Sequence, residues 1–209
     1  MKRIKVSNNV IRRMPRYLRK LDDLNAAGIE RISSGELGRQ MGLTPSQIRQ
    51  DFSCFGEFGQ QGYGYNVEEL RSEIGHILGV DNDHHLIMIG VGNLGRALLN
   101  NFPFENTGFT VDASFDVSPD VIDTQINGIP VYSTDELESY IKRHAVDVVV
   151  LTIPQAVAQA TANRLIDLGI RGFWNFTNVE LSSSDPAVKF ENIHFADSLL
   201  ALSYRIANR

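Results

Sequence analysis

The segment that most constrains the fold is a glycine-rich loop between an apolar run at residues 86–89 and a helical pattern. The loop reads Gly90-Val91-Gly92-Asn93-Leu94-Gly95. This G-x-G-x-x-G spacing, directly after a strand and opening a helix, is typical of dinucleotide-binding domains. Gly90 permits the turn, Gly92 lets a pyrophosphate approach the backbone, and Gly95 lets helix and strand pack closely. The free N–H groups at the start of the helix would then bind the phosphates.

A carboxylate in the expected place narrows the choice of nucleotide. A second strand, near residues 110–115, ends at Asp116, which lies 21 residues after Gly95. A carboxylate there accepts hydrogen bonds from the adenosine ribose and repels a 2′-phosphate, and no arginine follows it closely. NAD(H) is therefore favoured over NADP(H). The alternative is a Rossmann-like domain for another nucleotide, such as the adenine part of coenzyme A.

The rest of this region predicts a doubly wound α/β domain. Apolar runs at 129–132, 146–153 and 170–176 alternate with helical patterns, one of which opens with the capping box Ser133-x-x-Glu136. Continuous apolar strands are typical of a parallel sheet buried on both faces. Ligands bind beyond the carboxyl ends of such strands, so we expect a crevice lined by Val117, Thr152, Ile153, Pro154, Asn175 and Phe176. The alternative role of these residues is to end their strands.

Four helical patterns precede this domain, the last of them over residues 67–78. The first covers residues 10–24, and Pro15 either begins or kinks it. The second covers residues 34–41 and is closed by a glycine. The third begins at Thr44, and Gln47 is placed to complete a capping box. A short helix, a turn with glycine and a well-capped second helix form a helix-turn-helix pattern.

The third helix and the segment after it point to DNA. Arginine can bind guanine and glutamine can bind adenine through two hydrogen bonds in the major groove, and this helix turns toward solvent Ser46, Gln47, Arg49, Gln50 and Ser53. Glycines alternate with aromatic residues over 56–65, which is typical of the wing of a winged-helix domain. Gln60 and Gln61 would form its tip, near Tyr63, and read A·T-rich sequence in the minor groove. The alternative is a surface hairpin with no role in binding.

The charge distribution agrees with this division. The net charge is −5, yet residues 1–80 carry 12 Lys and Arg against 9 Asp and Glu, whereas residues 81–209 carry 8 against 16. A basic end on an acidic protein predicts an anionic partner, so we assign to DNA binding the basic residues Arg12, Arg13 and Arg16; a solvated arm is the alternative. We expect a DNA-binding domain over 1–80 and a nucleotide domain over 84–195, with His84 and His85 in the linker.

The last residues differ from both domains. A helix over residues 196–209 is apolar on more than one face, because it carries Leu199, Leu200, Leu202, Tyr204 and Ile206. We expect it to dock into a second subunit; the alternative is that it packs on its own sheet.

Other functional classes lack the residues that they need. The single Cys54 excludes an intrachain disulfide and a cysteine metal site, which favours a reducing cytoplasm. No apolar run is long enough to span a membrane, and none of the five histidines has metal-ligand spacing. A dehydrogenase normally carries a substrate domain, and no room remains for one. An NADH-responsive DNA-binding regulator is therefore favoured over a small NAD-dependent oxidoreductase.

Over almost its whole length the chain resembles the Rex family of redox-sensing transcriptional repressors. The resemblance rests on residues 12–19 (RRMPRYLR), 46–52 (SQIRQDF) and 55–67, on the glycine loop, and on Asp116, Asn175-Phe176 and Glu191-Asn192. Residues 55–67 are the most specific, because a dinucleotide fold does not need them. The resemblance implies a homodimer with a domain-swapped C-terminal helix. Such a dimer represses genes of fermentative or anaerobic metabolism and leaves its inverted-repeat operator when NADH replaces NAD⁺.

The resemblance also implies roles for single residues. Phe195 matches an aromatic residue near the nicotinamide. Arg19 matches an arginine that pairs, in some members, with an aspartate where this chain has His194. Asn101 stands where those members carry a tyrosine. The contact that couples the two domains is therefore absent or rebuilt here, and we hypothesise that His194 makes the coupling partly pH-dependent.

Overall fold

The computed structural model describes residues 6–56, 58–59 and 63–208. Their contacts divide the chain into two compact units, one up to Asp81 and one from Asn82 onward. Each unit has a hydrophobic core of its own.

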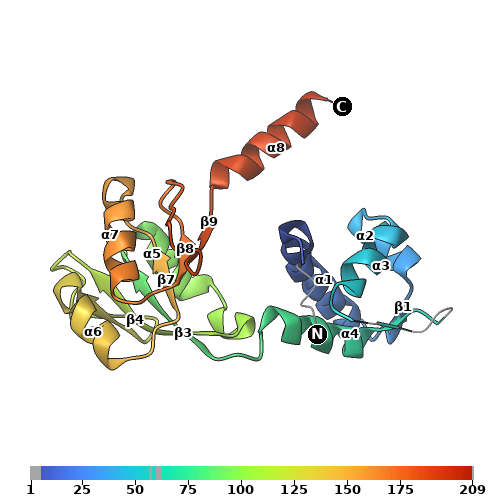
Figure 1. The fold of residues 1–209 in the computed structure, drawn as a ribbon, viewed down its shortest axis with the longest axis horizontal. Coiled ribbons are helices and arrows are strands. Elements are labelled where there is room, and N and C mark those ends of the chain that lie inside the picture. Colours follow the sequence, from blue (N-terminus) through green and yellow to red (C-terminus); the bar gives the residue numbers. More distant parts are fainter. Residues whose placement is uncertain (1–5, 57, 60–62, 209) are drawn as a thin grey trace. The chain divides into compact units, whose positions relative to one another are not determined.

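The first unit is a small helical domain with one short ribbon (Figure 1). Helix α1 packs against α4, and α2 packs against α3. Tyr17 and Phe52 lie at the centre of the core, with their rings 4.9 Å apart. The elements are α1 (Asn8–Ala26), β1 (Arg31–Ile32), α2 (Ser34–Met41), α3 (Pro45–Ser53), β2 (Tyr65–Asn66) and α4 (Val67–Leu78).

Helix α1 continues through Pro15. It begins at Asn8, after Ser7, whose hydroxyl accepts a hydrogen bond from the Val10 amide at 3.4 Å. The possibility that the helix begins at Pro15 is therefore wrong. A proline inside a helix removes one backbone donor, and the burial of Met14 beside it helps to offset that loss.

The predicted caps at Gly42 and Thr44 are confirmed, whereas the Gln47 side chain, predicted to complete a capping box, donates to Asp51. Helix α2 ends at Gly42, which is left-handed with φ 68°. The Thr44 hydroxyl accepts a hydrogen bond from the Gln47 amide at 3.2 Å and so opens α3. The turn is tight, because a Cβ on Gly38 would lie 2.5 Å from the carbonyl oxygen of Leu43. Helix α3 is shorter than predicted, since it ends two residues before position 55.

Strand β2 follows the glycine-rich segment and pairs with β1 in an antiparallel ribbon. Ile32 lies opposite Tyr65. Glycine is needed next to this pair, because a Cβ on Gly64 would lie 2.6 Å from the carbonyl oxygen of Ile32. The predicted wing tip, Gln60 and Gln61, lies outside the described residues.

The second unit is a seven-stranded sheet flanked by helices (Figure 1). Its strand order is β5-β6-β4-β3-β7-β8-β9, and every pair is parallel except β5 with β6. Without β5 this is the 3-2-1-4-5-6 order of the doubly wound dinucleotide fold, as predicted. The strands are β3 (His84–Ile89), β4 (Phe109–Asp116), β5 (Gln125–Ile126), β6 (Ile129–Ser133), β7 (Val148–Leu151), β8 (Gly172–Asn175) and β9 (Lys189–Asn192).

Helices cover both faces of this sheet. Along β3, Ile87 and Ile89 enter a core shared with α6 and α7, whereas Leu86 and Met88 enter a second core shared with α5. Successive side chains of a strand alternate between faces, so a strand covered on both faces is apolar throughout. The helices are α5 (Asn93–Asn101), η1 (Phe104–Thr107), η2 (Thr134–Glu136), α6 (Leu137–Arg143), α7 (Gln155–Asp167) and α8 (Phe195–Ala207), where η marks a 3-10 helix.

Some predictions for this unit were wrong. The two histidines assigned to the linker begin β3, where Nδ1 of His85 lies 2.9 Å from a carboxylate oxygen of Asp112. The hydroxyl of Ser133 accepts from the Asp135 amide at 3.2 Å, so it caps η2 rather than α6. Strand β9 was not predicted, because its alternate residues are exposed and it lacks a continuous apolar run.

Helix α8 buries none of its residues in the described chain. The alternative that it packs on its own sheet is therefore wrong. Its large apolar side chains are about half to three-quarters exposed: Phe195, Leu199, Leu200, Leu202, Tyr204 and Ile206. No helix among the described residues is long and apolar enough to cross a membrane.

Candidate functional site

The carboxyl ends of the central strands form one edge of the sheet. Ile89 of β3 lies between Phe115 of β4 and Leu151 of β7 in register. Backbone hydrogen bonds continue past the strands, from Gly90 N to Phe115 O at 2.8 Å and from Thr152 N to Ile89 O at 3.0 Å. The glycine loop, Asp116 and Thr152 are thus held side by side, where nucleotides bind in this fold.

The three glycines of the loop are needed for different reasons. Gly90 has φ 95°, and a Cβ there would lie 2.8 Å from the carbonyl oxygen of Thr152. A Cβ on Gly95 would lie 2.2 Å from the carbonyl oxygen of Gly90, so helix and strand could not pack. A Cβ on Gly92 would meet no protein atom within 4 Å. Packing therefore requires Gly90 and Gly95, whereas Gly92 leaves open backbone that a ligand can approach.

Helix α5 presents free donors at its N-terminus. Gly92 is its N-cap, so no side chain accepts a hydrogen bond from the first turn, and this turn contains no acidic residue. Such an end attracts a phosphate group through its N–H groups and its partial positive charge. The exposed Asn93 and half-buried Leu94 follow directly, while Val91 is buried beneath the loop.

Asp116 is held by backbone amides. One carboxylate oxygen accepts from Val91 N at 2.7 Å, and the other accepts from Ser118 N at 2.8 Å. These two bonds tie the glycine loop to the loop after β4. A carboxylate oxygen can accept more than one hydrogen bond, so Asp116 can also bind the hydroxyls of a ribose.

A cavity of about 430 Å³ lies over this edge. Predicted residues that line it are Gly90, Gly92, Asp116, Val117, Thr152, Ile153 and Pro154. Thr134 also lines it and was missed, because it follows a short strand whose capping pattern was assigned to a helix. The Thr152 hydroxyl donates to the carbonyl oxygen of Gly90 at 2.6 Å and fixes the cavity wall.

Asn175 and Phe176 support the edge from inside. Asn175 is 1% exposed, and its side-chain amide donates to Val179 O at 2.6 Å and to Asn192 Oδ1 at 2.8 Å. Its own oxygen accepts from the amide and hydroxyl of Thr177. Phe176 is buried, and its ring lies 6.0 Å from that of the exposed Phe195 at the start of α8.

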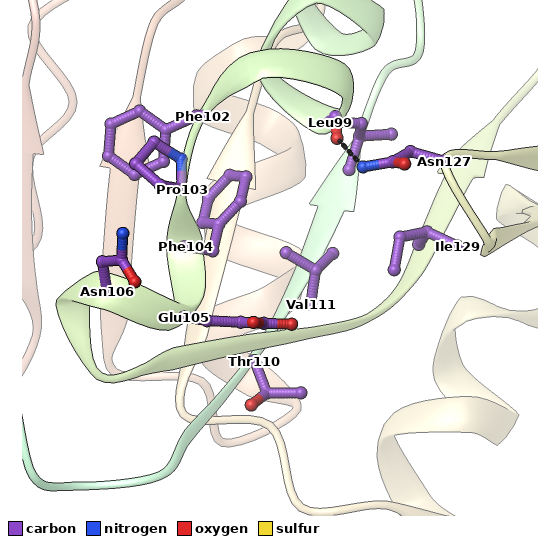
Figure 2. Close-up of a pocket in the computed structure, with 10 residues that line it drawn as sticks. All are labelled: Leu99, Phe102, Pro103, Phe104, Glu105, Asn106, Thr110, Val111, Asn127 and Ile129. Carbon is purple, nitrogen blue, oxygen red and sulfur yellow. Dashed lines mark hydrogen bonds between the residues drawn. The ribbon is translucent and has the colours of Figure 1, made fainter.

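A second cavity of about 380 Å³ lies elsewhere in this unit (Figure 2). It lies between the end of α5, η1 and the first residues of β4, with Thr110 and Val111 on one side and Asn127 on another. Thr110 lies at the opposite end of β4 from Asp116. Because nucleotides bind at the carboxyl ends of the strands in this fold, this cavity is separate from the candidate nucleotide site.

In the first unit, α3 presents a polar face. Ser46, Arg49, Gln50 and Ser53 are exposed as predicted, and Gln47 is half-buried. A guanidinium nitrogen of Arg49 donates to the hydroxyl of Ser34, the first residue of α2, at 3.0 Å. On other elements, Arg12, Arg16 and Tyr63 are exposed as well.

Arg13 was predicted to bind DNA, but its guanidinium has a partner inside the unit. It donates to the two carboxylate oxygens of Asp51 at 2.7 and 2.8 Å. The Tyr17 hydroxyl donates to the same carboxylate at 2.8 Å. Asp51 was missed, although it follows Ile48 by three residues and so falls on the buried face of α3.

The side chains of Arg13, Tyr17 and Asp51 shift one another's pKa values. Burial raises the pKa of Asp51, but hydrogen bonds from Arg13, Tyr17 and Gln47 outweigh it and hold the pKa below its usual value. The hydrogen bond to Asp51 raises the pKa of Arg13. Burial, reinforced by the hydrogen bond to Asp51, raises the pKa of Tyr17. All three groups therefore keep at neutral pH the protonation states that the bonds require.

Two of the three residues assigned to coupling, His194 and Asn101, have local partners. A nitrogen of His194 lies 3.6 Å from a carboxylate oxygen of Glu180. The Asn101 amide donates to the carbonyl oxygen of Ala97, and Arg19 is exposed on α1. Among the described residues, no group of three or more His, Cys, Asp and Glu side chains could hold a metal ion.

Two family models match the chain. The model described as "Putative DNA-binding protein N-terminus" matches residues 5–53, and the model described as "CoA binding domain" matches residues 81–179. The chain is also similar to a crystal structure of RSP in complex with beta-NAD⁺ and operator DNA. That similarity has a TM-score of 0.92 and 45% identity, and covers 98% of this chain and 94% of that one. RSP in complex with beta-NADH matches with a TM-score of 0.91 and 42% identity, over 98% and 96% of the two chains.

Curated relatives match over nearly their whole length. The redox-sensing transcriptional repressor Rex of Thermoanaerobacter pseudethanolicus is 46% identical, over 98% of this chain and 91% of that protein. Rex of Clostridium beijerinckii is 46% identical over 95% and 94%, and Rex of Caldicellulosiruptor saccharolyticus is 47% identical over 98% and 93%. The chain therefore belongs to the Rex family of redox-sensing transcriptional repressors.

Proposed function

We propose that this protein binds operator DNA as a homodimer while NAD⁺ occupies its second unit, and that NADH releases it. The observation that carries this proposal is the presence, in one chain, of a capped helix-turn-helix and a strand-end cavity with an open glycine loop and a carboxylate. The RSP structures, one with beta-NAD⁺ and operator DNA and one with beta-NADH, support both ligands.

The DNA contacts divide by type. Arg49 and Gln50 on α3 would read base edges in the major groove, as arginine and glutamine do with guanine and adenine. Ser46, Ser53, Arg12 and Arg16 would bind phosphates, and Tyr63 would lie beside the minor groove. Phosphate contacts give affinity that falls steeply with salt.

The nucleotide contacts follow the cavity. The N-terminus of α5 would bind the pyrophosphate and Asp116 the adenosine ribose. Phe195, which is exposed and near Phe176, would lie against the nicotinamide. An uncharged nicotinamide leaves water for an aromatic surface more readily than a cationic one, so this contact would favour NADH over NAD⁺.

The dimer would form through α8. A helix with six large apolar side chains exposed in one chain needs a partner to bury them. A twofold dimer would read an inverted repeat, with half-sites about one or two helical turns apart.

Release follows from linkage. If NADH binds better to a conformation with low DNA affinity, NADH must lower the affinity for DNA by the same factor by which DNA lowers the affinity for NADH. The coupling free energy is typically of order 1–3 kcal/mol. The test is DNA binding to a library of promoter fragments with NAD⁺, with NADH and without nucleotide. We expect selected fragments to bind with NAD⁺ and to be released by NADH; equal binding in all three would contradict the proposal. Adding coenzyme A as a competitor tests the other nucleotide class, and displacement of NADH at similar concentration would favour it.

A further inference from the structure

A carboxylate is buried on the inner face of α3, the helix proposed to read DNA. The Asp51 side chain is 1% exposed, and it lies on the face of α3 that packs toward α1. Arg13 and Tyr17, one helical turn apart on α1, donate three hydrogen bonds of 2.7–2.8 Å to it. Gln47, one turn before Asp51 on α3, lies on the same side with its amide 3.4 Å from the carboxylate. One acidic group therefore joins α1 to α3.

This link, together with the buried Ile48 and Phe52, sets the rotation of α3. Successive helical residues are about 100° apart, so Arg49 lies about 160° from Asp51, and Ser46 and Ser53 lie close to Arg49. Holding Asp51 inward thus points these three side chains outward. A turn of α3 by a few tens of degrees would move Arg49 away from the base edges and the two serines away from the phosphates, and direct readout depends on the angles of paired hydrogen bonds.

The same ion pair neutralises the positive charge of Arg13. Its side chain is 21% exposed, and two of its nitrogens are bound to Asp51. An arginine paired with a carboxylate adds no net charge for phosphates. Arg16, on the same helix, is exposed and does not share this partner.

We propose that Asp51, Arg13 and Tyr17 are positioning residues for DNA recognition, and that Arg13 acts through Asp51 rather than on a phosphate. This inference rests on the proposed function, in which α3 reads the major groove. The rival interpretation is that Arg13 leaves Asp51 and binds a phosphate in the complex.

Tyr17 separates the two interpretations. It is completely buried and cannot touch DNA. Tyr17→Phe removes one hydrogen bond to Asp51 and keeps the ring that packs on Phe52. A second variant, Arg13→Gln with Asp51→Asn, removes the ion pair without changing the net charge, which keeps the comparison free of a lone buried charge.

The experiment measures binding to a selected operator and to a scrambled duplex at several salt concentrations. It is done at a temperature where urea unfolding finds every variant folded. We expect both variants to bind the operator about 10-fold more weakly, since hydrogen bonds to charged groups have effects of this size. Binding to the scrambled duplex should stay within about twofold, and the slope of log affinity against log salt should not change.

Arg16→Gln is the matched control. It removes an exposed cation from α1, so it should weaken both duplexes alike and reduce the slope by about 0.9. The inference is overturned if Tyr17→Phe binds the operator as well as wild type, or if the double variant loses a slope of about 0.9. A loss of both duplexes in parallel by Tyr17→Phe would also overturn it, because the loss would then concern general DNA affinity and not sequence recognition. If wild type selects no operator at all, the proposed function fails instead.

Discussion

Each unit holds a carboxylate at its candidate site, buried beneath α3 in the first and lining the cavity in the second, and the two are held by different kinds of hydrogen-bond donor. Asp51 is held by side chains, those of Arg13 and Tyr17, which lie 38 and 34 residues away in sequence. Asp116 is held by the backbone amides of Val91 and Ser118. Backbone donors are present in any sequence that follows the same path, whereas side-chain donors depend on residue identity. The position of Asp116 therefore depends on the path of the backbone, whereas the position of Asp51 depends on the identity of two distant side chains.

Substitutions in the glycine loop test the second unit, where the backbone holds Asp116, and should have the largest effects. Gly95→Ala places a Cβ 2.2 Å from the carbonyl oxygen of Gly90, and backbone atoms must move to relieve the clash. We expect it to destabilise the second unit by about 3 kcal/mol and to lower NADH affinity at least 100-fold. The measurement is urea unfolding followed by Trp174 fluorescence, with NADH titration.

Gly92→Ala is the control for that experiment, because its Cβ meets no protein atom. It should leave unfolding unchanged within about 0.5 kcal/mol and weaken NADH binding about 10-fold, since the methyl group would stand in the path proposed for the pyrophosphate. Equal effects of the two substitutions on unfolding would contradict the different roles given to the two glycines.

Lowering the pH tests the side-chain hydrogen bonds that hold Asp51. The folded-state pKa of Asp51 lies below its usual value, so its contribution to stability is present above the unfolded-state pKa and is lost as the pH falls through the folded one. At pH 7 we expect Asp51→Asn to destabilise the first unit by about 2 kcal/mol. Below about pH 4 the difference from wild type should shrink. Amide hydrogen exchange of α3 measures it, and a difference independent of pH would show that charge is not involved.

Replacing the Asp116 carboxylate should change the choice of nucleotide more than the stability of the second unit. Asp116→Asn keeps an acceptor but removes the charge that repels a 2′-phosphate. We expect NADH to bind about 10-fold more weakly, about 1.4 kcal/mol, and NADPH to bind more tightly than to wild type. The exposed Asp120 offers a matched control, since Asp120→Asn should alter neither affinity. Titration with both nucleotides measures this, and an unchanged NADH to NADPH ratio would remove Asp116 from the ribose site.

A surface ion pair should give the smallest effect. Arg71 on α4 donates to Asp22 on α1, with both side chains nearly half exposed. Exposed pairs contribute about 0–1 kcal/mol, so Arg71→Ala should change the unfolding free energy of the first unit by about 0.5 kcal/mol or less. A loss as large as that of Asp51→Asn would mean that exposure does not distinguish the two ion pairs.

Local signals explain what could be predicted from the sequence. The glycine loop and the caps at Gly42 and Thr44 act within a few residues, and the structure has them where the pattern put them. The predicted β3 was two residues too short at its amino end. Its first two residues are histidines, and these polar residues do not extend the apolar run.

Long-range partners explain what could not be predicted. Nothing near Asp51 in sequence indicates that Arg13 binds it, so an arginine on a basic helix was assigned to DNA. Asn175 was expected to face the ligand because it ends a strand, yet its hydrogen bonds go to Val179, Asn192 and Thr177 inside the unit. A strand end fixes where a residue lies but not the direction of its side chain.

The bond between Arg13 and Asp51 also has a consequence for the order of events during synthesis. Helix α1 precedes the other helices of the first unit in the chain, so Arg13 is synthesised before its partner Asp51. Helices α2 and α3 can begin from their own caps, but α3 acquires its rotation only after residue 51 has emerged and a loop of 38 residues has closed. The charge of α1 is therefore present in the chain before the contact that orients α3, and α4, which also packs against α1, is added later still.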